Sequence, residues 1–245
     1  ESNPEEYLAS LAVAKILVNG SRYCTAWRVG PENYLFTNEH CIRAASEVPA
    51  TEVWFDHENI DCGGKAARAP IKVTGRDLLL SDGTLDYTLF TVNDFALISD
   101  FGYLGLGVGQ VAVGDQIYIP QHGGGLPKQM AVSSDMNATG ECEIDDIAHW
   151  GYDAESDLGY FCDTRDGSSG APVILRGTQN VVALHHLGGC VNSGAKMSLI
   201  WPQVAEFFGG VVPVAPGSTP SPNKVPTASI SSSCVGLACT FDAGQ

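Results

Sequence analysis

Basic residues are scarce in this sequence. Its 245 residues include 13 lysines and arginines against 28 aspartates and glutamates, for a formal net charge of −15. Without a cluster of basic side chains the chain cannot neutralise a phosphate backbone, which disfavours nucleic-acid binding. No apolar run approaches the roughly 20 residues that a membrane-spanning helix needs. We therefore expect neither a nucleic-acid partner nor a membrane span, and we interpret the acidic excess as a solvated surface that would also attract basic substrates.

Metal-binding spacings are also absent. The eight cysteines contain no Cys-x-x-Cys pair, and His57, His122 and His149 form no short-spaced ligand pattern. The acidic stretch 141–146 is more typical of a solvated loop than of a Ca²⁺ site. We expect no metal and no cofactor. An even number of cysteines outside metal motifs favours disulfides, and with them an oxidising, extracellular location.

Helical periodicity is rare along the chain. Short apolar runs recur between clusters of Gly, Asn, Asp and Pro, and glycine occurs 28 times, a pattern typical of an all-β barrel or sandwich. The best helical stretch is 201–208, where Val204, Phe207 and Phe208 share one face. We expect it to follow a strand over 196–200, as a short helix packed on a β domain.

The most informative stretch is 163–173, Asp-Thr-Arg-Asp-Gly-Ser-Ser-Gly-Ala-Pro-Val. Its glycines allow a tight turn in which backbone N–H groups converge on one point, and an apolar strand over 172–175 follows. A serine in such a turn suits a nucleophile. Ser169 and Ser168 are the two candidates.

A histidine occupies a matching context upstream. Apolar runs over 25–29 and 34–37 flank the turn residues 30–33, which predicts a hairpin. His40 follows the second strand directly. A disulfide between Cys24 and Cys41 would fasten the loop that carries this histidine to the first strand.

Asp86 opens a β-branched and aromatic strand, where a buried carboxylate needs a partner. An imidazole N–H would serve. Asp82 is the competing acid, but it lies in Leu-Ser-Asp-Gly, which predicts a turn.

The chain order is therefore His40, Asp86, Ser169, which among the known arrangements of this triad is that of chymotrypsin. The chain resembles the chymotrypsin and trypsin-fold serine peptidases, and more closely the secreted bacterial glutamyl and lysyl endopeptidases. The resemblance covers roughly residues 10–210 of the chain. The residues that carry it are Thr-Asn-Glu-His-Cys at 37–41, Asp-Tyr-Thr-Leu-Phe at 86–90, Gly-Ser-Ser-Gly-Ala-Pro-Val at 167–173 and Leu-His-His-Leu-Gly-Gly-Cys at 184–190.

The resemblance implies a fold of two six-stranded antiparallel β-barrels with the active site between them and a short C-terminal helix. It implies Ser169 as nucleophile, because the reactive serine of the family directly precedes the glycine of Gly-Ala-Pro. His40 would be the general base, Asp86 its orienting acid, and the N–H groups of Gly167 and Ser169 the oxyanion hole. Trypsin-like animal enzymes carry an aspartate where this chain has Ser168, so we do not expect activation through a freed amino terminus.

The specificity pocket is ambiguous in sequence. Asp163 matches the acid that binds Arg or Lys in trypsin-like enzymes, and a buried structural acid is an equal alternative for it. Thr164 and His185 match the pair that binds a substrate carboxylate in glutamyl endopeptidases, and Gly188 would line the same pocket. His185 and His186 alternate across a strand, so only one of them faces the pocket. We favour cleavage after Arg or Lys, with cleavage after Glu or Asp as the alternative.

Three further disulfides are expected. The resemblance implies Cys162–Cys190, since the family has a bridge of that kind beside the nucleophile. Cys234–Cys239 would close a local hairpin, and elimination then leaves Cys62–Cys142.

We expect three segments: a peptidase domain over 1–212, a Pro-rich linker over 213–222, and over 223–245 a truncated stretch that resembles the opening of a PKD domain. The predicted function is that of a secreted, monomeric serine endopeptidase acting on proteins or peptides. One alternative is a catalytically silent binding module, against which the intact triad argues. An esterase using the same triad is another.

Overall fold

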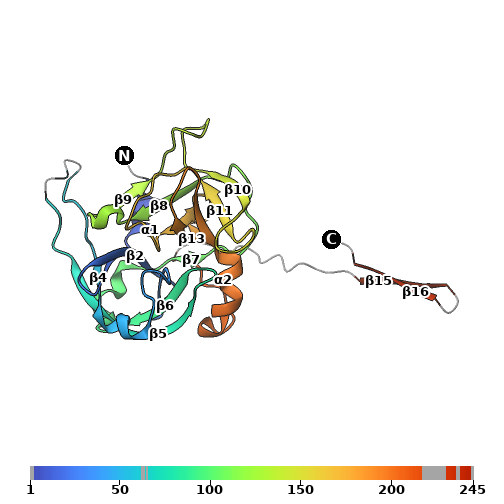
Figure 1. Cartoon of the computed structure of the whole chain (residues 1–245), viewed down its shortest axis with the longest axis horizontal. Helices are drawn as coiled ribbons and strands as arrows, with labels where there is room; N and C mark the ends of the chain where they lie inside the picture. Colours follow the sequence, from blue (N-terminus) through green and yellow to red (C-terminus); the bar gives the residue numbers. More distant parts are fainter. Residues whose placement is uncertain (1–2, 62–63, 65, 217–229, 236–237, 244–245) are drawn as a thin grey trace.

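The first half of the molecule is a closed barrel. The computed structural model describes residues 3–61, 64, 66–216, 230–235 and 238–243. Six strands close in the order β1-β2-β3-β6-β5-β4. They are β1 (Val13–Val18), β2 (Arg22–Arg28), β3 (Leu35–Thr37), β4 (Thr51–Phe55), β5 (Ile71–Asp82) and β6 (Tyr87–Val92). Figure 1 labels β2, β4, β5 and β6 of this barrel. Their alternate side chains fill a core that includes Ile16, Val53 and Phe90.

The second half is a sheet that stays open, which corrects the prediction of a second six-stranded barrel. Its order is β10-β11-β14-β13-β12-β8-β9, with β7 paired in parallel to β13. The strands are β7 (Gly105–Leu106), β8 (Ile117–Gln121), β9 (Gln129–Ala131), β10 (Ile144–His149), β11 (Asp157–Tyr160), β12 (Pro172–Leu175), β13 (Asn180–Leu187) and β14 (Asn192–Lys196).

The reason for the open edge lies between β9 and β10. In the described part of the chain, the β-pairing of this connection is limited to two isolated bridges, Ser133↔Glu141 within the connection and Gln116↔Glu143 to the residue before β8. The connection is rich in Ser, Asp, Asn and Gly, which disfavour a continuous ladder. The buried Asn137 side chain instead donates to the carboxylates of Glu143 and Asp145.

One α-helix precedes the first strand of the barrel, and another follows β14. The first is α1 (Pro4–Ser10), and the last is α2 (Met197–Val204), which continues as a short 3₁₀ turn over Ala205–Phe208. The helix thus begins at the end of β14, where we had expected a strand over 196–200. Met197, Ile200 and Val204 are buried at helical spacing against a core shared by both halves, and this packing outweighs the strand-like composition. Other 3₁₀ turns span Ala45–Ala50, Phe95–Leu97, Ser99–Phe101 and Gly123–Gly125.

The disulfides differ in part from those expected. Cys24 bonds to Cys41, while Cys142 bonds to Cys162. The pairings Cys162–Cys190 and Cys62–Cys142 are therefore wrong. Ile144 of β10 is the register partner of Tyr160 of β11. Cys142 and Cys162 lie two positions beyond this antiparallel pair, so they face each other as well. Cys190 is exposed and free, and Cys62 lies outside the described residues.

The end of the chain adds a separate two-stranded sheet, β15 (Ile230–Val235) with β16 (Ala238–Ala243). Cys234 and Cys239 are register partners there, but their predicted disulfide concerns side chains outside the described part. Upstream, Pro213 is buried and its carbonyl accepts from the Leu106 amide at 2.9 Å. Among the described residues, no helix is long and apolar enough to cross a membrane.

Candidate active site

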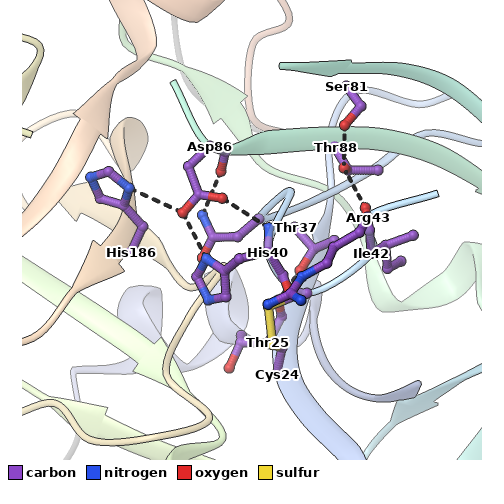
Figure 2. A network of polar contacts seen from close by, with 12 residues as sticks. Cys24, Thr25, Thr37, His40, Ile42, Arg43, Ser81, Asp86, Thr88 and His186 are labelled. Atoms are coloured by element: carbon purple, nitrogen blue, oxygen red, sulfur yellow. Dashed lines mark hydrogen bonds and ion pairs between the residues drawn. A yellow bond between two sulfur atoms is a disulfide. The ribbon is translucent and has the colours of Figure 1, made fainter. Parts of the chain in front are cut away.

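His40 and Asp86 meet where the first barrel faces the second sheet. The Nδ1 atom of His40 lies 2.7 Å from Oδ2 of Asp86, and the His40 backbone N–H donates to Oδ1 at 3.0 Å (Figure 2). Asp86 is 1% exposed, whereas the His40 side chain keeps 30% of its surface. The imidazole is therefore held by a buried carboxylate on one side and open on the other.

The turn before β6 sets the direction of the Asp86 side chain. Asp86 has a φ of 49°, in the left-handed region that Asp tolerates better than most residues. The carboxylate of Asp82 caps this turn by accepting from the amides of Thr84 and Leu85 at 2.8 and 2.7 Å. Asp82 thus stabilises the turn. The side-chain amide of Asn38 donates a hydrogen bond of 2.8 Å to the backbone carbonyl of Asp86.

The buried carboxylate of Asp86 accepts hydrogen bonds from both His40 and His186. Burial raises the pKa of Asp86, but hydrogen bonds from His186 and His40 outweigh this and lower the pKa to about 2. Asp86 is consequently ionised throughout the neutral range.

Two consecutive residues of β2 anchor the loops that carry the candidate base and nucleophile. Cys24 bonds to Cys41, the neighbour of His40. Thr25 donates from its amide to the Ser169 carbonyl at 2.8 Å and from its hydroxyl to the Gly167 carbonyl at 2.9 Å. Because adjacent positions of one strand hold both loops, the strand brings the His40 loop and the serine turn together.

The two serines of the turn lie in different environments. Ser168 is fully buried, and its hydroxyl accepts from the Arg165 amide at 3.1 Å. Ser169 is partly exposed. The hydroxyl of Ser168 therefore holds the turn, and Ser169 is the more accessible of the two serines.

The turn also leaves two amides without partners. Within the part of the chain that the structure describes, neither Gly167 nor Ser169 donates its N–H to another group. Gly167 adopts a φ of 93° and Gly170 a φ of 84°. A Cβ at Gly170 would collide with the Thr25 carbonyl oxygen and lie 2.6 Å from the Thr37 hydroxyl, so only glycine fits there. Unpaired amides in a rigid turn are suited to bind a developing oxyanion.

A family model described as a trypsin-like peptidase domain matches residues 24–184, which include His40, Asp86 and Ser169. The chain belongs to the trypsin-like peptidase family.

Two curated proteins resemble this peptidase domain. The chain is 35% identical over 195 residues to secreted RxLR effector protein 73 of Plasmopara viticola, across 76% of this chain and 47% of that protein. It is 31% identical over 196 residues to the uncharacterized protein y4fB of Sinorhizobium fredii, across 74% of this chain and 28% of that protein. The chain thus spans less than half the length of either relative.

Solved structures share the trypsin-like fold. The inactive form of the Rv3671c protease superposes with a TM-score of 0.61 at 15% identity, over 83% of this chain and 92% of that one. A Glu endopeptidase superposes with a TM-score of 0.58 at 17% identity, over 82% of this chain and 92% of that one. Deg5 superposes with a TM-score of 0.59 at 12% identity, over 85% of this chain and 98% of that one. These likenesses describe the fold alone.

Of the four residues predicted for the specificity pocket, Asp163 and Thr164 line a cavity, while His185 and Gly188 are not among the residues that line it. Asp163 and Thr164 line a cavity of about 380 Å³ together with Arg165, Gln121 and residues 129–133. His185 is instead 3% exposed, and its Nδ1 atom lies 2.8 Å from the hydroxyl of Tyr160. Gly188 is exposed. Burial, together with the charge of His186, lowers the pKa of His185 to about 3.

One group of potential metal ligands was found in the described residues, namely Cys24, His40 and Cys41. Because the two sulfur atoms form a disulfide, they have no thiolate to offer a metal.

Sequence reasoning missed three groups that support the site: Thr25, His186 and Asp157. The only local signal for Thr25 was its position next to Cys24. His186 appeared in the motif at 184–190 but was weighed only against His185 for a place in the pocket. Asp157 lies in no recognisable motif.

Proposed function

We propose that this chain is a secreted serine endopeptidase that cleaves proteins through an acyl-enzyme on Ser169. Ser169 attacks the scissile carbonyl, His40 takes its proton and gives it to the leaving amine, and Asp86 orients the imidazole and stabilises its cation. The observation that carries the proposal is the two-point contact between His40 and Asp86. It assigns Nδ1 to the carboxylate and leaves Nε2 for the nucleophile.

The oxyanion hole in this proposal consists of the Gly167 and Ser169 amides. Their lack of partners among the described residues supports it, because both remain available to a tetrahedral intermediate. Ser168 has a structural role, since its hydroxyl is already used in the turn.

A fluorophosphonate probe and casein hydrolysis test the nucleophile. The natural chain and Ser168→Ala should both be labelled, whereas Ser169→Ala should show neither labelling nor hydrolysis. Labelling of Ser169→Ala would contradict the assignment. A natural chain that is neither labelled nor active would be a silent binding module, and one that hydrolyses simple esters but not casein would be an esterase.

We further propose cleavage after Arg or Lys. The Asp163 side chain is exposed at the cavity described above, and the net charge of −15 favours the approach of basic substrates. The alternative, cleavage after Glu or Asp, has a Glu endopeptidase among the similar folds. It requires His185 to meet a carboxylate, but this residue is buried and its pKa of about 3 keeps it uncharged at neutral pH.

A peptide-library digest separates the two specificities. Cleavage after Arg and Lys, reduced in Asp163→Asn, supports the first. Cleavage only after Glu would exclude it.

Secretion and domain limits belong to the same proposal. The Plasmopara relative is named a secreted effector, and the disulfides are typical of an oxidising compartment. We propose a monomeric peptidase domain over 1–212, a linker over 213–222, and the start of a PKD-like domain over 223–245. Limited proteolysis that cuts first inside 213–222 and leaves an active fragment would support these limits.

A further inference from the structure

The carboxylate of Asp86 contacts a second histidine besides His40 (Figure 2). The Nδ1 atom of His186 lies 3.1 Å from Oδ2 of Asp86, and its Nε2 atom lies 2.6 Å from Oδ2 of Asp157. The side chains of His186 and Asp157 are fully buried. His186 and Asp157 therefore extend the chain of contacts that begins with His40 and Asp86.

The partners of His186 determine its protonation. Each of its ring nitrogens faces a carboxylate oxygen, and an ionised carboxylate only accepts hydrogen bonds. Both nitrogens must therefore donate, which requires the imidazolium form. Burial lowers the pKa of His186, but the hydrogen bonds to Asp157 and Asp86 outweigh this and raise the pKa to about 9.

Asp157 is held firmly in its ionised form. It accepts hydrogen bonds from the hydroxyls of Ser193 at 2.5 Å and Ser156 at 2.8 Å, in addition to His186. Burial raises the pKa of Asp157, but the hydrogen bonds from His186, Ser193 and Ser156 and the charge of His186 together outweigh this effect, and the pKa is lowered. The ring of Tyr152 covers His186 edge-on at 5.2 Å. Three further side chains, those of Asp86, Ser156 and Ser193, thus complete the hydrogen bonds of one buried cation and its counter-ion.

We propose that His186, kept cationic by Asp157, is a positioning residue for the His40–Asp86 pair. It holds the Asp86 carboxylate against His40 and offsets part of the negative charge that Asp86 presents to the imidazole. The proposal rests on the peptidase function proposed above. Its consequence is that the Asp86 carboxylate keeps the orientation in which it contacts both Nδ1 and the backbone N–H of His40.

Other titratable groups around His186 do not supply this charge. They are His40 and Glu39 from the segment after β3, His185 from β13 and Tyr152 from the β10–β11 connection. The lowered pKa of His185 and the raised pKa of Tyr152 keep both uncharged at neutral pH. Glu39 is acidic and acts in the opposite direction. His186 is thus the cation in contact with Asp86.

Kinetics of three variants test the proposal. His186→Gln removes the cation and keeps an N–H donor, Asp157→Asn removes its counter-ion, and the double variant removes both charges together. We expect His186→Gln and the double variant to lower kcat by roughly ten- to hundredfold with little change in KM, because the reacting groups are misplaced while substrate contacts remain. The acid limb of their kcat/KM profile should move to higher pH. Asp157→Asn should add a new ionisation as His186 begins to titrate.

His149→Gln is the matched control. This histidine also pairs with an aspartate, Asp146 at 3.1 Å, but both side chains are partly exposed and neither contacts Asp86. Its variant should keep the natural rate and pH profile.

A measurement without turnover separates this proposal from the peptidase function. In a Ser169→Ala background, imidazole ¹H–¹⁵N spectra should show both ring N–H protons of His186 at neutral pH. The same spectra should show a displaced Nδ1–H signal of His40 when His186→Gln is added, because the Asp86 carboxylate that this proton contacts is no longer held in place. A neutral His186, or a His40 Nδ1–H signal that does not move, would overturn the proposal even if the natural chain is an active peptidase. Natural protein that cleaves nothing would contradict the peptidase function alone.

Discussion

The amide of Thr25 donates to the carbonyl of Ser169 at 2.8 Å, so a strand of the closed barrel holds the turn that carries the candidate nucleophile. The Thr25 hydroxyl adds a second bond to that turn and accepts from the His122 amide at 3.0 Å. One buried threonine thereby joins the two halves of the molecule at the point where they must cooperate.

Thr25→Val should therefore impair catalysis more than a simple core substitution would. Losing a buried hydroxyl that serves as donor and acceptor should lower the free energy of unfolding by about 1–3 kcal/mol. It should also reduce kcat by roughly tenfold or more through misplacement of the turn. Thr25→Ser keeps the hydroxyl and is the matched control. Equal losses in both variants, measured by urea unfolding and peptide hydrolysis, would refute this role.

Gly170 should tolerate no side chain. In Gly170→Ala the new methyl group would strike the Thr25 carbonyl while the backbone has a φ of 84°, so we expect a loss of at least about 2 kcal/mol in unfolding free energy. Gly177 has nothing within 4 Å of an added Cβ, and Gly177→Ala should leave the melting temperature nearly unchanged. Thermal unfolding of the two variants makes the comparison.

The free energy of unfolding should reach its maximum near pH 6.5. His186 limits it at higher pH, and His122 and His185 limit it at lower pH. The pKa of His186 in the folded protein is raised to about 9. Its contribution to the free energy of unfolding, up to about 3 kcal/mol, is therefore complete below the unfolded-state pKa near 6.5 and is lost as the pH rises through 9. The pKa values of His122 and His185 are lowered to about 3 by burial, so their contribution is lost as the pH falls from 6.5 toward 3. Urea unfolding across this range measures both limbs. In His186→Gln the alkaline limb should flatten and the acid limb should persist; retention of the alkaline limb would contradict the assignment.

Cys142 and Cys190 should respond differently to substitution. The Cys142–Cys162 bridge closes a segment with a sequence separation of 20, which corresponds to about 3 kcal/mol of chain entropy. Cys142→Ser should lower the melting temperature accordingly, whereas Cys190→Ser should not. Peptide mapping under non-reducing conditions should recover residues 142 and 162 in one linked fragment. A fragment linking residues 162 and 190 would restore the pairing expected from the family.

The sequence alone was most informative where short motifs carry the chemistry. The turn around Ser169, the hairpin before His40 and the acid at the start of β6 all depend on neighbouring residues, and the order of the three indicated the family. The assignment of Asp82 to a turn rests on the same kind of local signal.

What could not be predicted depends on pairing between distant strands. The Cys142–Cys162 bridge follows from the register of β10 on β11, which no motif announces. The contact of His186 with Asp157 needs β11, β13 and β14 to lie side by side. Alternation along β13 predicted that His185 and His186 would face opposite ways, but not that His186 would meet Asp86. The prediction that the second sheet closes into a barrel was wrong, because family resemblance says little about the irregular connection between β9 and β10.

The fully buried Ser168 has a consequence for when the site forms. Among the described residues, its hydroxyl and the Thr25 contacts fasten the nucleophile turn from within the folded domain. We therefore propose that the turn forms when the domain folds, without a newly released amino group. A tag or leader fused ahead of residue 1 should then leave the turn intact.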